Sequence, residues 1–423
     1  MRKHDAVYKA YVQILKEELV PAMGCTEPIA VAYCAAKAKE ALGAIPDKIE
    51  IKVSGNILKN VKSVVVPNTD GLVGVEASAA AGIIGGKPEK ELEVISEITP
   101  EQKVQIKEYL KQAAFFVAPT YGEELLEIIV TVEKDGHTAT AHIQKGHANI
   151  VSLEKDGNVR MQNDQSEGAK QSADRGLLNI KDIIEFADTV EIDDIRESIQ
   201  KQIECNSAIS KAGFDEDWGA CIGKTIQETQ GTLLRTKAKA AAAAGADARM
   251  SGCELPVIIV SGSGNQGITA SMPVITYARE LGKTEEELYR ALCVSNLVTI
   301  HEKTGIGKMS AFCGALCAGS GAGAAIAYMQ GADLQTISHT IISSLGIVSG
   351  MVCDGAKPSC AAKVAAAVDC GILGYELCLK EKRLMGGDGI LSDDVEKTIR
   401  NVGRMGKDGM AETDHVIQAI MTE

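Results

Sequence analysis

The sequence predicts an α+β protein, with an N-terminal α/β domain (residues 1–170) that holds a small, largely antiparallel sheet and a mostly α-helical, Gly- and Ala-rich C-terminal domain (residues 171–423). Three observations predict this division. The chain of 423 residues exceeds the roughly 250–300 at which one hydrophobic core stops growing. Alternating apolar residues, typical of strands, gather before residue 170. Beyond Gln171 helical spacing and small residues take over.

The first segment predicts two helices on either side of a cysteine. Apolar residues recur at helical spacing over Ala6–Leu19, and Pro21 stops that run. A second helix is expected over Pro28–Leu42, because Pro28 has the fixed φ suited to a first turn and Gly43 can end the helix. Cys25 therefore lies near a helix N-terminus.

Strands are expected where apolar residues alternate or run together. Lys134-Asp135-Gly136 and Lys155-Asp156-Gly157 supply Asp-Gly turns between neighbouring strands. The predicted strands are Lys48–Val53, Leu125–Val132, His137–Ile143 and Asn149–Leu153.

The second half predicts helices and a linker before them. Polar residues Asp164–Asp174 are expected to link the two domains. Helices are expected over Ile192–Cys205 and Thr284–Val298, and the run Ala240–Ala244 predicts a helix closed by a glycine cap at Gly245. The windows Met309–Ala332 and Leu334–Cys353 lack charged side chains but are rich in Gly and Ser, so we expect buried helices and no membrane span.

Composition excludes several classes of partner. Forty-four Lys and Arg against 57 Asp and Glu give a net charge of −13, which repels phosphate backbones and anionic lipid, so we expect neither a nucleic-acid nor a membrane partner. The N-terminus lacks the apolar core and cleavage site of a signal peptide, which predicts a cytoplasmic protein. Its 12 cysteines should then be reduced thiols that serve packing, metal ligation or catalysis.

A glycine-rich loop follows the apolar run 257–260. The dinucleotide fingerprint that it resembles also needs a second strand ending in an acidic residue, whereas the segment from Thr284 predicts a helix. Glycines at a helix N-terminus instead expose backbone N–H groups that bind a carboxylate or phosphate. A plain tight turn would give the same pattern, but Asn265 and Gln266 favour a binding site. The candidate substrate-binding residues are Ser261, Ser263, Asn265, Gln266 and Gly267.

A second glycine run, 319–323, follows no strand and lies among alanines, so we expect close helix packing there. Three thiols are more suggestive. Cys353 and Cys360 flank a segment that Gly355 and Pro358 keep out of regular helix, and Cys313 lies 40 residues earlier. Three soft sulfur ligands suit zinc or an iron–sulfur cluster, although the spacing matches no specific metal motif and scattered core cysteines remain an alternative.

Together five motifs resemble the L-cysteine desulfidase family. Part of the chain, from about Val257 to Cys360, also resembles the α-type domain of iron–sulfur L-serine dehydratases. The five motifs, in chain order and over nearly the whole sequence, are Gly24-Cys-Thr-Glu-Pro28, Ser54-Gly-Asn-Ile-Leu-Lys-Asn60, Ser261-Gly-Ser-Gly-Asn-Gln-Gly267, Gly307-Lys-Met-Ser-Ala-Phe-Cys-Gly314 and Cys353-Asp-Gly-Ala-Lys-Pro-Ser-Cys360.

The resemblance implies a 4Fe–4S cluster held by Cys313, Cys353 and Cys360, with the fourth iron open to substrate; Cys317 is the substitute ligand. It implies β-elimination of L-cysteine, and also of L-serine, to pyruvate and ammonia. It places Cys25 at the active site, as a temporary fourth ligand or as the proton acceptor. Substrate-binding roles are expected for Asn56, Lys59, Lys303 and Lys308, and His301 and the last two lysines are weaker candidates for the base.

Two rival functions remain open at the level of sequence. A pyridoxal-phosphate lyase could perform the same elimination, because Ser263-Gly-Asn-Gln-Gly267 resembles the substrate loop of some such enzymes, but it needs a Schiff-base lysine. A non-enzymatic redox sensor would use the thiols and leave the glycine loop without a role. The choice between cysteine and serine stays open, and the small-residue helices could pack within one subunit or across a homo-oligomer interface.

Overall fold

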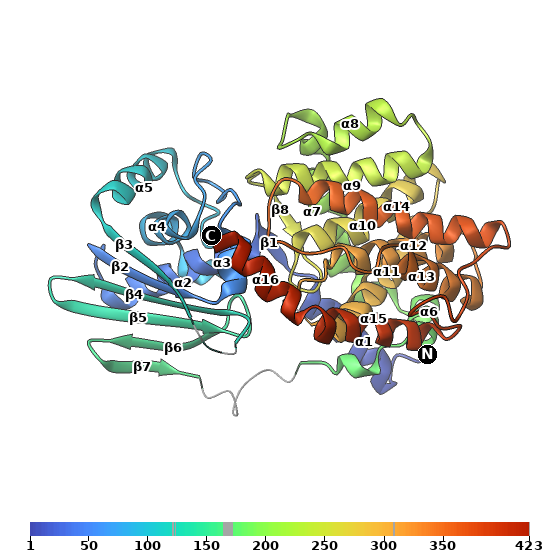
Figure 1. Cartoon of the computed structure of the whole chain (residues 1–423), viewed down its shortest axis with the longest axis horizontal. Coiled ribbons are helices and arrows are strands. Elements are labelled where there is room, and N and C mark those ends of the chain that lie inside the picture. Colours follow the sequence, from blue (N-terminus) through green and yellow to red (C-terminus); the bar gives the residue numbers. More distant parts are fainter. Residues whose placement is uncertain (121, 123, 164–171, 308, 423) are drawn as a thin grey trace.

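The computed structural model describes residues 1–120, 122, 124–163, 172–307 and 309–422. It confirms the predicted α+β class, with a sheet-bearing part beside a helical part (Figure 1). The predicted linker falls largely on residues 164–171, outside the described residues.

One six-stranded sheet has the order β3-β2-β4-β5-β6-β7, and every neighbouring pair is antiparallel except β2 and β3. The Asp-Gly turns form as expected, with Asp135 and Asp156 in positive-φ conformations before their glycines. The strands are β2 (Lys48–Val53), β3 (Ala114–Pro119), β4 (Glu127–Lys134), β5 (His137–Gln144), β6 (Ile150–Lys155) and β7 (Asn158–Gln162).

Two of these strands were not predicted from the sequence. Strand β3 is short and pairs in parallel with β2, so its partner is about 65 residues away in the chain and no hairpin turn marks it. Strand β7 lies at the sheet edge with every residue exposed, and it therefore lacks an alternation of apolar and polar side chains.

Helices cover one face of the sheet and share its hydrophobic core. Helix α2 packs against β4 and β5 and against α4, where a Cβ at Gly82 would overlap the carbonyl of Ala32. Close approach of these Ala-rich helices explains the small side chains. The helices of this part are α2 (Thr26–Leu42), α3 (Gly55–Val61), α4 (Val75–Gly85), the 3₁₀ turn η1 (Pro88–Glu93) and α5 (Pro100–Gln112).

The helical part has its own core, which also includes the first helix of the chain, α1 (Ala6–Glu18). A two-stranded antiparallel sheet, β1 (Pro21–Met23) with β8 (Pro256–Ile258), then joins the two parts. The remaining helical elements are η2 (Arg175–Leu177), α6 (Ile180–Thr189), α7 (Ile192–Asp215), α8 (Ile222–Thr229), α9 (Leu234–Met250), α10 (Gly264–Glu280), α11 (Glu285–Ile306), α12 (Ala315–Met329), α13 (Leu334–Val348), α14 (Cys360–Leu379), α15 (Val395–Arg404), η3 (Met405–Gly409) and α16 (Ala411–Thr422).

The expected glycine cap at Gly245 is wrong. Helix α9 continues through this glycine to Met250, because both of its sides are buried and Gly245 lies against Ser210 of α7 and Ile268 of α10. Gly245 therefore allows α9 to pack closely against α7 and α10 in the middle of its length.

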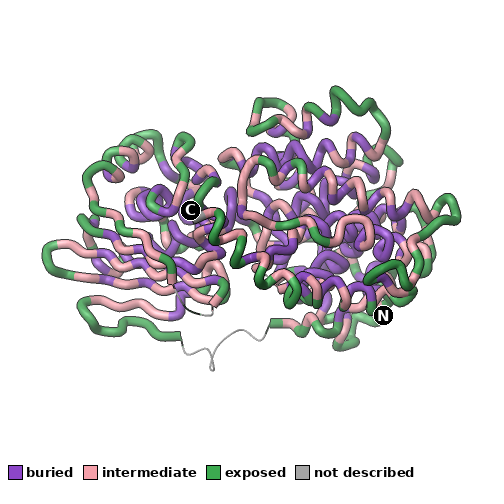
Figure 2. Tube along the Cα trace, viewed as in Figure 1, coloured by how far each residue is buried: buried purple, intermediate pink, exposed green. Residues whose placement is uncertain are grey.

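Both uncharged windows contain helices of the core, α12 and α13. Within the described part of the chain, no helix is both long enough and apolar enough to cross a bilayer. The glycine run packs as expected, since a Cβ at Gly319 or Gly323 would overlap a carbonyl of α14. Figure 2 shows the buried residues concentrated in these central helices.

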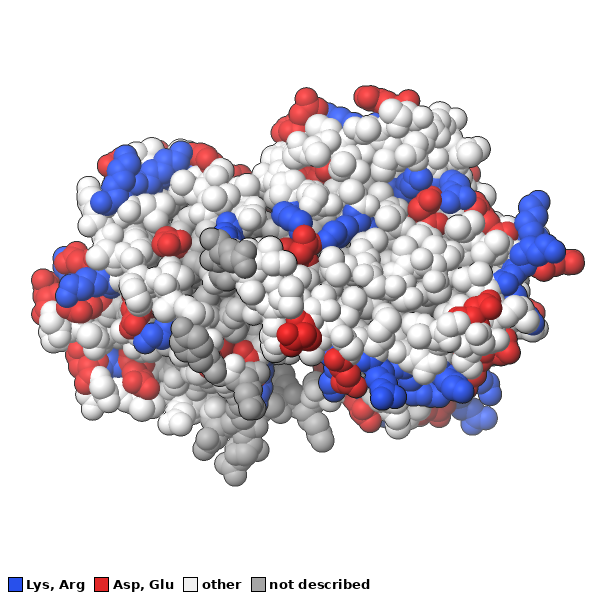
Figure 3. Space-filling view, viewed as in Figure 1, with Lys and Arg blue, Asp and Glu red and all other residues white. Residues whose placement is uncertain are grey.

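The last helix, α16, crosses between the two parts and contacts α3 (Figure 1). On the same face Lys and Arg are interspersed with Asp and Glu, with no broad field of one sign (Figure 3). A pocket that takes residues from both parts includes Lys59 of α3, which pairs with Asp414 of α16.

Candidate active site

One pocket brings together side chains from the sheet-bearing part and the helical part. The sheet-bearing part supplies residues from the start of α2, from α3 and from the loop after β5. The helical part supplies the end of α9, the start of α10, the end of α11 and the segments around the three cysteines. Eleven residues predicted from the sequence line it: Cys25, Asn56, Lys59, Ser261, Ser263, Asn265, Gln266, Lys303, Cys313, Cys353 and Cys360.

A short antiparallel bridge brings together the segments that carry two of the cysteines. Cys313 N–H donates to the carbonyl of Met351 at 3.0 Å, and Cys353 N–H donates to the carbonyl of Ala311 at 2.6 Å. These bonds flank an isolated antiparallel bridge between Phe312 and Val352. Residues 40 apart in sequence are thereby fixed side by side.

Cys360 joins them as the first residue of α14. Its N–H donates to the carbonyl of Lys357 at 2.9 Å, and the turn before it places the thiol on the same pocket. Burial, and then repulsion between its thiolate and those of the neighbouring Cys353 and Cys360, raise the pKa of Cys313 to about 12. The three sulfurs are therefore close enough to interact electrostatically.

The donor set fits an iron–sulfur cluster. Within the described ranges, no three His, Cys, Asp or Glu side chains converge tightly enough to hold a single ion. A cubane cluster presents its irons at separate corners, so its thiolate ligands are spread more widely than those of one cation. Lys303 and Lys363 lie within electrostatic reach of these cysteines and would offset thiolate charge.

Cys25 lines the same pocket as the N-cap of α2, at 4% exposure. Its Sγ donates to Oε2 of Glu27 at 2.9 Å. A helix N-terminus ordinarily lowers the pKa of a thiol. In the protein itself the opposite holds, because burial, and then the Glu27 carboxylate, raise the pKa of Cys25 well above its usual value.

Glu27 connects Cys25 to two further residues. Its Oε1 accepts from Asn60 Nδ2 at 3.0 Å and lies 3.8 Å from Nε2 of His147, which is ion-pair distance and too long for a hydrogen bond. Burial alone would raise the pKa of Glu27, but His147 and the Cys25 thiol outweigh it and hold this pKa at about 2. A proton leaving Cys25 thus has a carboxylate and then an imidazole beside it.

The glycine loop ends at the start of α10 with its helix terminus open to the pocket. Ser261 has a φ of 48°, and Ser263 is the N-cap but makes no side-chain cap bond. The first N–H groups of a helix have no partner within it, so this terminus can bind an anion. Gly267 does not line the pocket, and a Cβ there would overlap the carbonyl of Ile258, so its lack of a side chain lets α10 pack on β8.

Buried polar atoms also line the pocket without a protein partner. Oδ1 of Asn56 and Oε1 of Gln266 are both buried acceptors with no hydrogen bond. Such unsatisfied groups are costly and therefore mark a place where a ligand or water binds.

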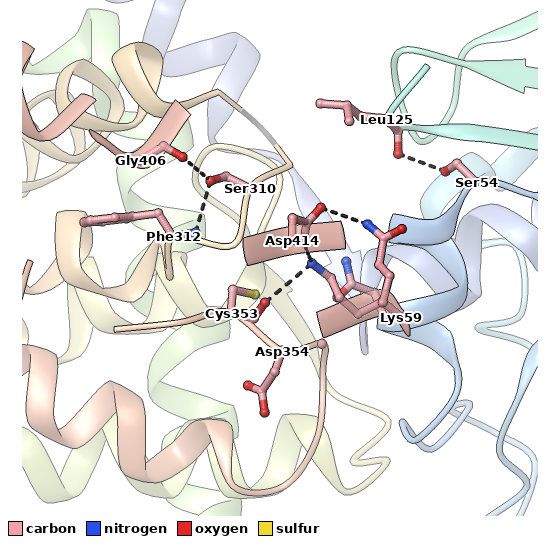
Figure 4. A network of polar contacts seen from close by, with 12 residues as sticks. Ser54, Lys59, Leu125, Ser310, Phe312, Cys353, Asp354, Gly406 and Asp414 are labelled. Atoms are coloured by element: carbon pink, nitrogen blue, oxygen red, sulfur yellow. Dashed lines mark hydrogen bonds and ion pairs between the residues drawn. The ribbon is translucent and has the colours of Figure 1, made fainter. Parts of the chain in front are cut away.

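The lysines differ in what holds them. Lys59, 3% exposed, pairs with Asp414 of α16 at 2.5 Å and donates to the carbonyl of Cys353 at 3.4 Å (Figure 4). Lys303 donates to the carbonyl of Gly307 at 2.5 Å, and burial lowers its pKa. Lys308 lies outside the described residues.

Two weaker candidates lie away from the pocket. Nε2 of His301 is 2.7 Å from Glu396 of α15, and Cys317 is fully buried in α12 beside Glu302. Neither lines the pocket.

Sequence reasoning misses five polar residues of the pocket, and long-range folding explains three of the omissions. His147, Arg249 and Lys363 reach the site only through tertiary structure. Glu27 and Asn60 lie inside the motifs 24–28 and 54–60, but nothing in the sequence alone distinguishes them from their neighbours.

The chain is similar to known proteins over most of the segments that form this site. The model of the serine dehydratase alpha chain matches residues 89–419, which include the glycine loop and all three cysteines of the trio. The chain belongs to the serine dehydratase alpha-chain family. Cys25 and α3 precede the matched region of this family.

Relatives extend over the whole chain, including Cys25. A UPF0597 protein of Desulfitobacterium hafniense is 55% identical over 100% of this chain and 98% of its own. UPF0597 proteins of Finegoldia magna and Lachnoclostridium phytofermentans are 47% and 46% identical, each over 98% of this chain and 100% of theirs.

Proposed function

We propose that the protein catalyses iron–sulfur-dependent β-elimination of L-cysteine to pyruvate, ammonia and sulfide, and that it also deaminates L-serine. One observation carries this proposal: three thiols from separate segments, a fourth thiol with a proton relay and an open helix N-terminus line one pocket. Membership of the serine dehydratase alpha-chain family supports the reaction class.

Cys313, Cys353 and Cys360 would hold the 4Fe–4S cluster, which supplies a Lewis acid for the leaving group. The start of α10 binds the substrate carboxylate through its backbone N–H groups. The unpartnered acceptors of Asn56 and Gln266 suit the α-ammonium group.

Proton transfer is assigned to Cys25. Its thiol proton passes by way of the Glu27 carboxylate, whose low pKa keeps it from holding the proton, to the imidazole of His147, and the thiolate then removes the proton from Cα of the substrate. The electron pair of that C–H bond forms the Cα–Cβ double bond, and the Cβ–S pair leaves with sulfide. Water hydrolyses the resulting aminoacrylate to pyruvate and ammonia, so no net redox change occurs.

Anaerobic reconstitution tests the proposal. The protein is loaded with iron and sulfide, its iron is counted, and pyruvate is assayed with L-cysteine and L-serine in parallel. We expect Cys313→Ala, Cys353→Ala and Cys360→Ala to lose iron and turnover. Cys378→Ala is the matched control, because Cys378 lies on α14 like Cys360 but contacts Thr336 and Thr340.

Equal iron loss in all four variants, or iron without pyruvate in the wild type, would contradict the proposal, and the second result would favour a redox sensor. For Cys25→Ala we expect a loss of turnover of about 10²–10⁴-fold with most iron retained, because a general base contributes about that much.

Lys303 favours a pyridoxal-phosphate lyase, because it is a buried lysine that lines the pocket, burial lowers its pKa and, unlike Lys59, it pairs with no carboxylate among the described residues. Borohydride reduction separates the two functions. A covalently reduced cofactor on Lys303 in an iron-free active protein would favour the lyase over the cluster enzyme.

We assign the reaction to the cytoplasm, which keeps free thiols reduced. The pairing of copies through small-residue helices also stays a proposal, and a solution mass measurement tests it.

A further inference from the structure

Arg249 is a buried cation in the pocket that the reaction described above leaves without a role. It lies in the last turn of α9, is 3% exposed and lines the pocket. Arginine is rarely buried to this extent unless its charge is paired.

No carboxylate pairs with it in the part of the chain that the structure describes. Its Nη1 donates to Oδ1 of Asn265 at 3.0 Å and contacts Sδ of Met250 at 3.4 Å, and both partners are neutral. Its Nε is buried without any hydrogen-bond partner. By contrast, Arg235 at the other end of α9 pairs with Asp369 and Glu376, although it is far more exposed.

The guanidinium lies against the first turn of α10. A Cβ at Gly264 would overlap Nε of Arg249, so the glycine is what admits the side chain to this position. The fork of Arg249 and the unpaired N–H groups at the start of α10 are therefore neighbours. A guanidinium beside an open helix N-terminus is a strong site for a carboxylate, because both donate charge-assisted hydrogen bonds to its two oxygens.

The same guanidinium is close enough to Cys25 to act on its thiol. Burial and Glu27 raise the pKa of Cys25, and the positive charge of Arg249 opposes them. A ligand held between Arg249 and the thiol trio would present its Cα near Cys25.

We infer that Arg249, with the first turn of α10, binds the α-carboxylate of the substrate and so selects amino acids over amines that lack this group. This inference deepens the proposed function and rests on it for the identity of the substrate. A purely structural brace for Asn265 is the alternative.

Equilibrium binding tests the inference without turnover. L-Alanine carries the carboxylate but no leaving group, and L-alaninamide differs from it by the loss of that charge. We expect anaerobic holoprotein to bind alanine at least tenfold more tightly in calorimetry. Arg249→Met should abolish this preference by weakening alanine alone, and Arg249→Lys should weaken alanine to an intermediate degree, because lysine keeps the charge but not the fork.

Arg235→Met is the matched control, since it removes the same side chain from the same helix outside the pocket, and it should leave the preference intact. A wild type without preference, an equal loss for both ligands, or unchanged alanine binding in Arg249→Met would overturn the inference. If Arg249→Met fails to fold, as judged by circular dichroism, Arg249→Lys decides by the same comparison.

Kinetics separate this inference from the proposed function. A holoprotein that turns over neither L-cysteine nor L-serine, yet binds alanine through Arg249, would refute the proposed function and support the inference. A protein that produces sulfide with an unchanged KM in Arg249→Met would refute the inference alone.

Discussion

Buried polar side chains of this protein are of two kinds at the residue scale. Those around the pocket, such as Asn56, Gln266 and Arg249, each have a buried atom without a hydrogen-bond partner among the residues that the structure describes. Asp247, two residues before Arg249, is equally buried but lies outside the pocket, and only one of its oxygens is satisfied, by the N–H of Gly223 at 2.9 Å.

Asp247 should make stability depend on pH. Burial raises the pKa of its carboxyl from 3.8 to about 6. A group with a raised folded-state pKa stabilises the fold fully below its unfolded pKa, and this contribution is lost as pH rises through about 6.

We expect Asp247→Asn to remove this loss. The variant should gain up to about 3 kcal/mol over the wild type at pH 8 and little at pH 4, because one pKa unit corresponds to about 1.4 kcal/mol. Urea unfolding at both pH values measures it, and an equal effect at the two would contradict the assignment.

The sequence predicted much of the pocket at this scale, but only where chemistry was local. Cys25 and the three cysteines of the proposed cluster, Cys313, Cys353 and Cys360, lie in short sequence motifs. The raised pKa of Cys25 and its relay through His147 could not be predicted, because His147 lies 120 residues away and meets Glu27 only after the loop following β5 folds over α2.

Close contacts between helices depend on glycines, which have no side chain. Helices α12 and α14 approach so closely that Gly319 faces the carbonyl of Ala367 and Gly323 faces that of Gly371. Helix α14, which begins at Cys360, is thus held against α12, the helix that follows Cys313.

Gly319→Ala should force these helices apart. We expect a loss of about 1–3 kcal/mol in unfolding free energy, the usual cost of overpacking, and weaker iron retention. Gly305→Ala on α11 is the control, because its Cβ would meet only Cα of Gly403 at 3.5 Å, an ordinary contact. Equal stability of the two variants would show that α12 can shift freely.

Element assignment from sequence succeeded where one face of a helix or strand was buried. Predicted helices matched α1, α2, α7 and α11 closely in their starts. The predicted helix end at Gly245 was wrong because tertiary packing against α7 and α10 overrode the local preference of glycine to end a helix.

A buried ion pair connects the two parts of the whole molecule. Lys59 of α3 and Asp414 of α16 are 2% and 9% exposed at their side chains. Figure 4 shows Lys59 between Asp414 and the carbonyl of Cys353, so the last helix is attached to the pocket wall.

Asp414→Asn should leave the lysine charge buried without a countercharge. We expect a loss of about 3–5 kcal/mol in unfolding free energy. The double variant Lys59→Met with Asp414→Leu should recover most of it, since it removes both charges together. A double variant as unstable as Asp414→Asn would mean that packing of α16, and not the charge, is what matters.

Strand β1 pairs with β8 across more than 230 residues, with Pro21 opposite Ile258. During synthesis β1 therefore leaves the ribosome long before β8, the strand with which it must pair. Cys360 emerges later still, so a cluster held by Cys313, Cys353 and Cys360, as proposed above, could form only after most of the polypeptide has left the tunnel, and the closure of such distant contacts is slow.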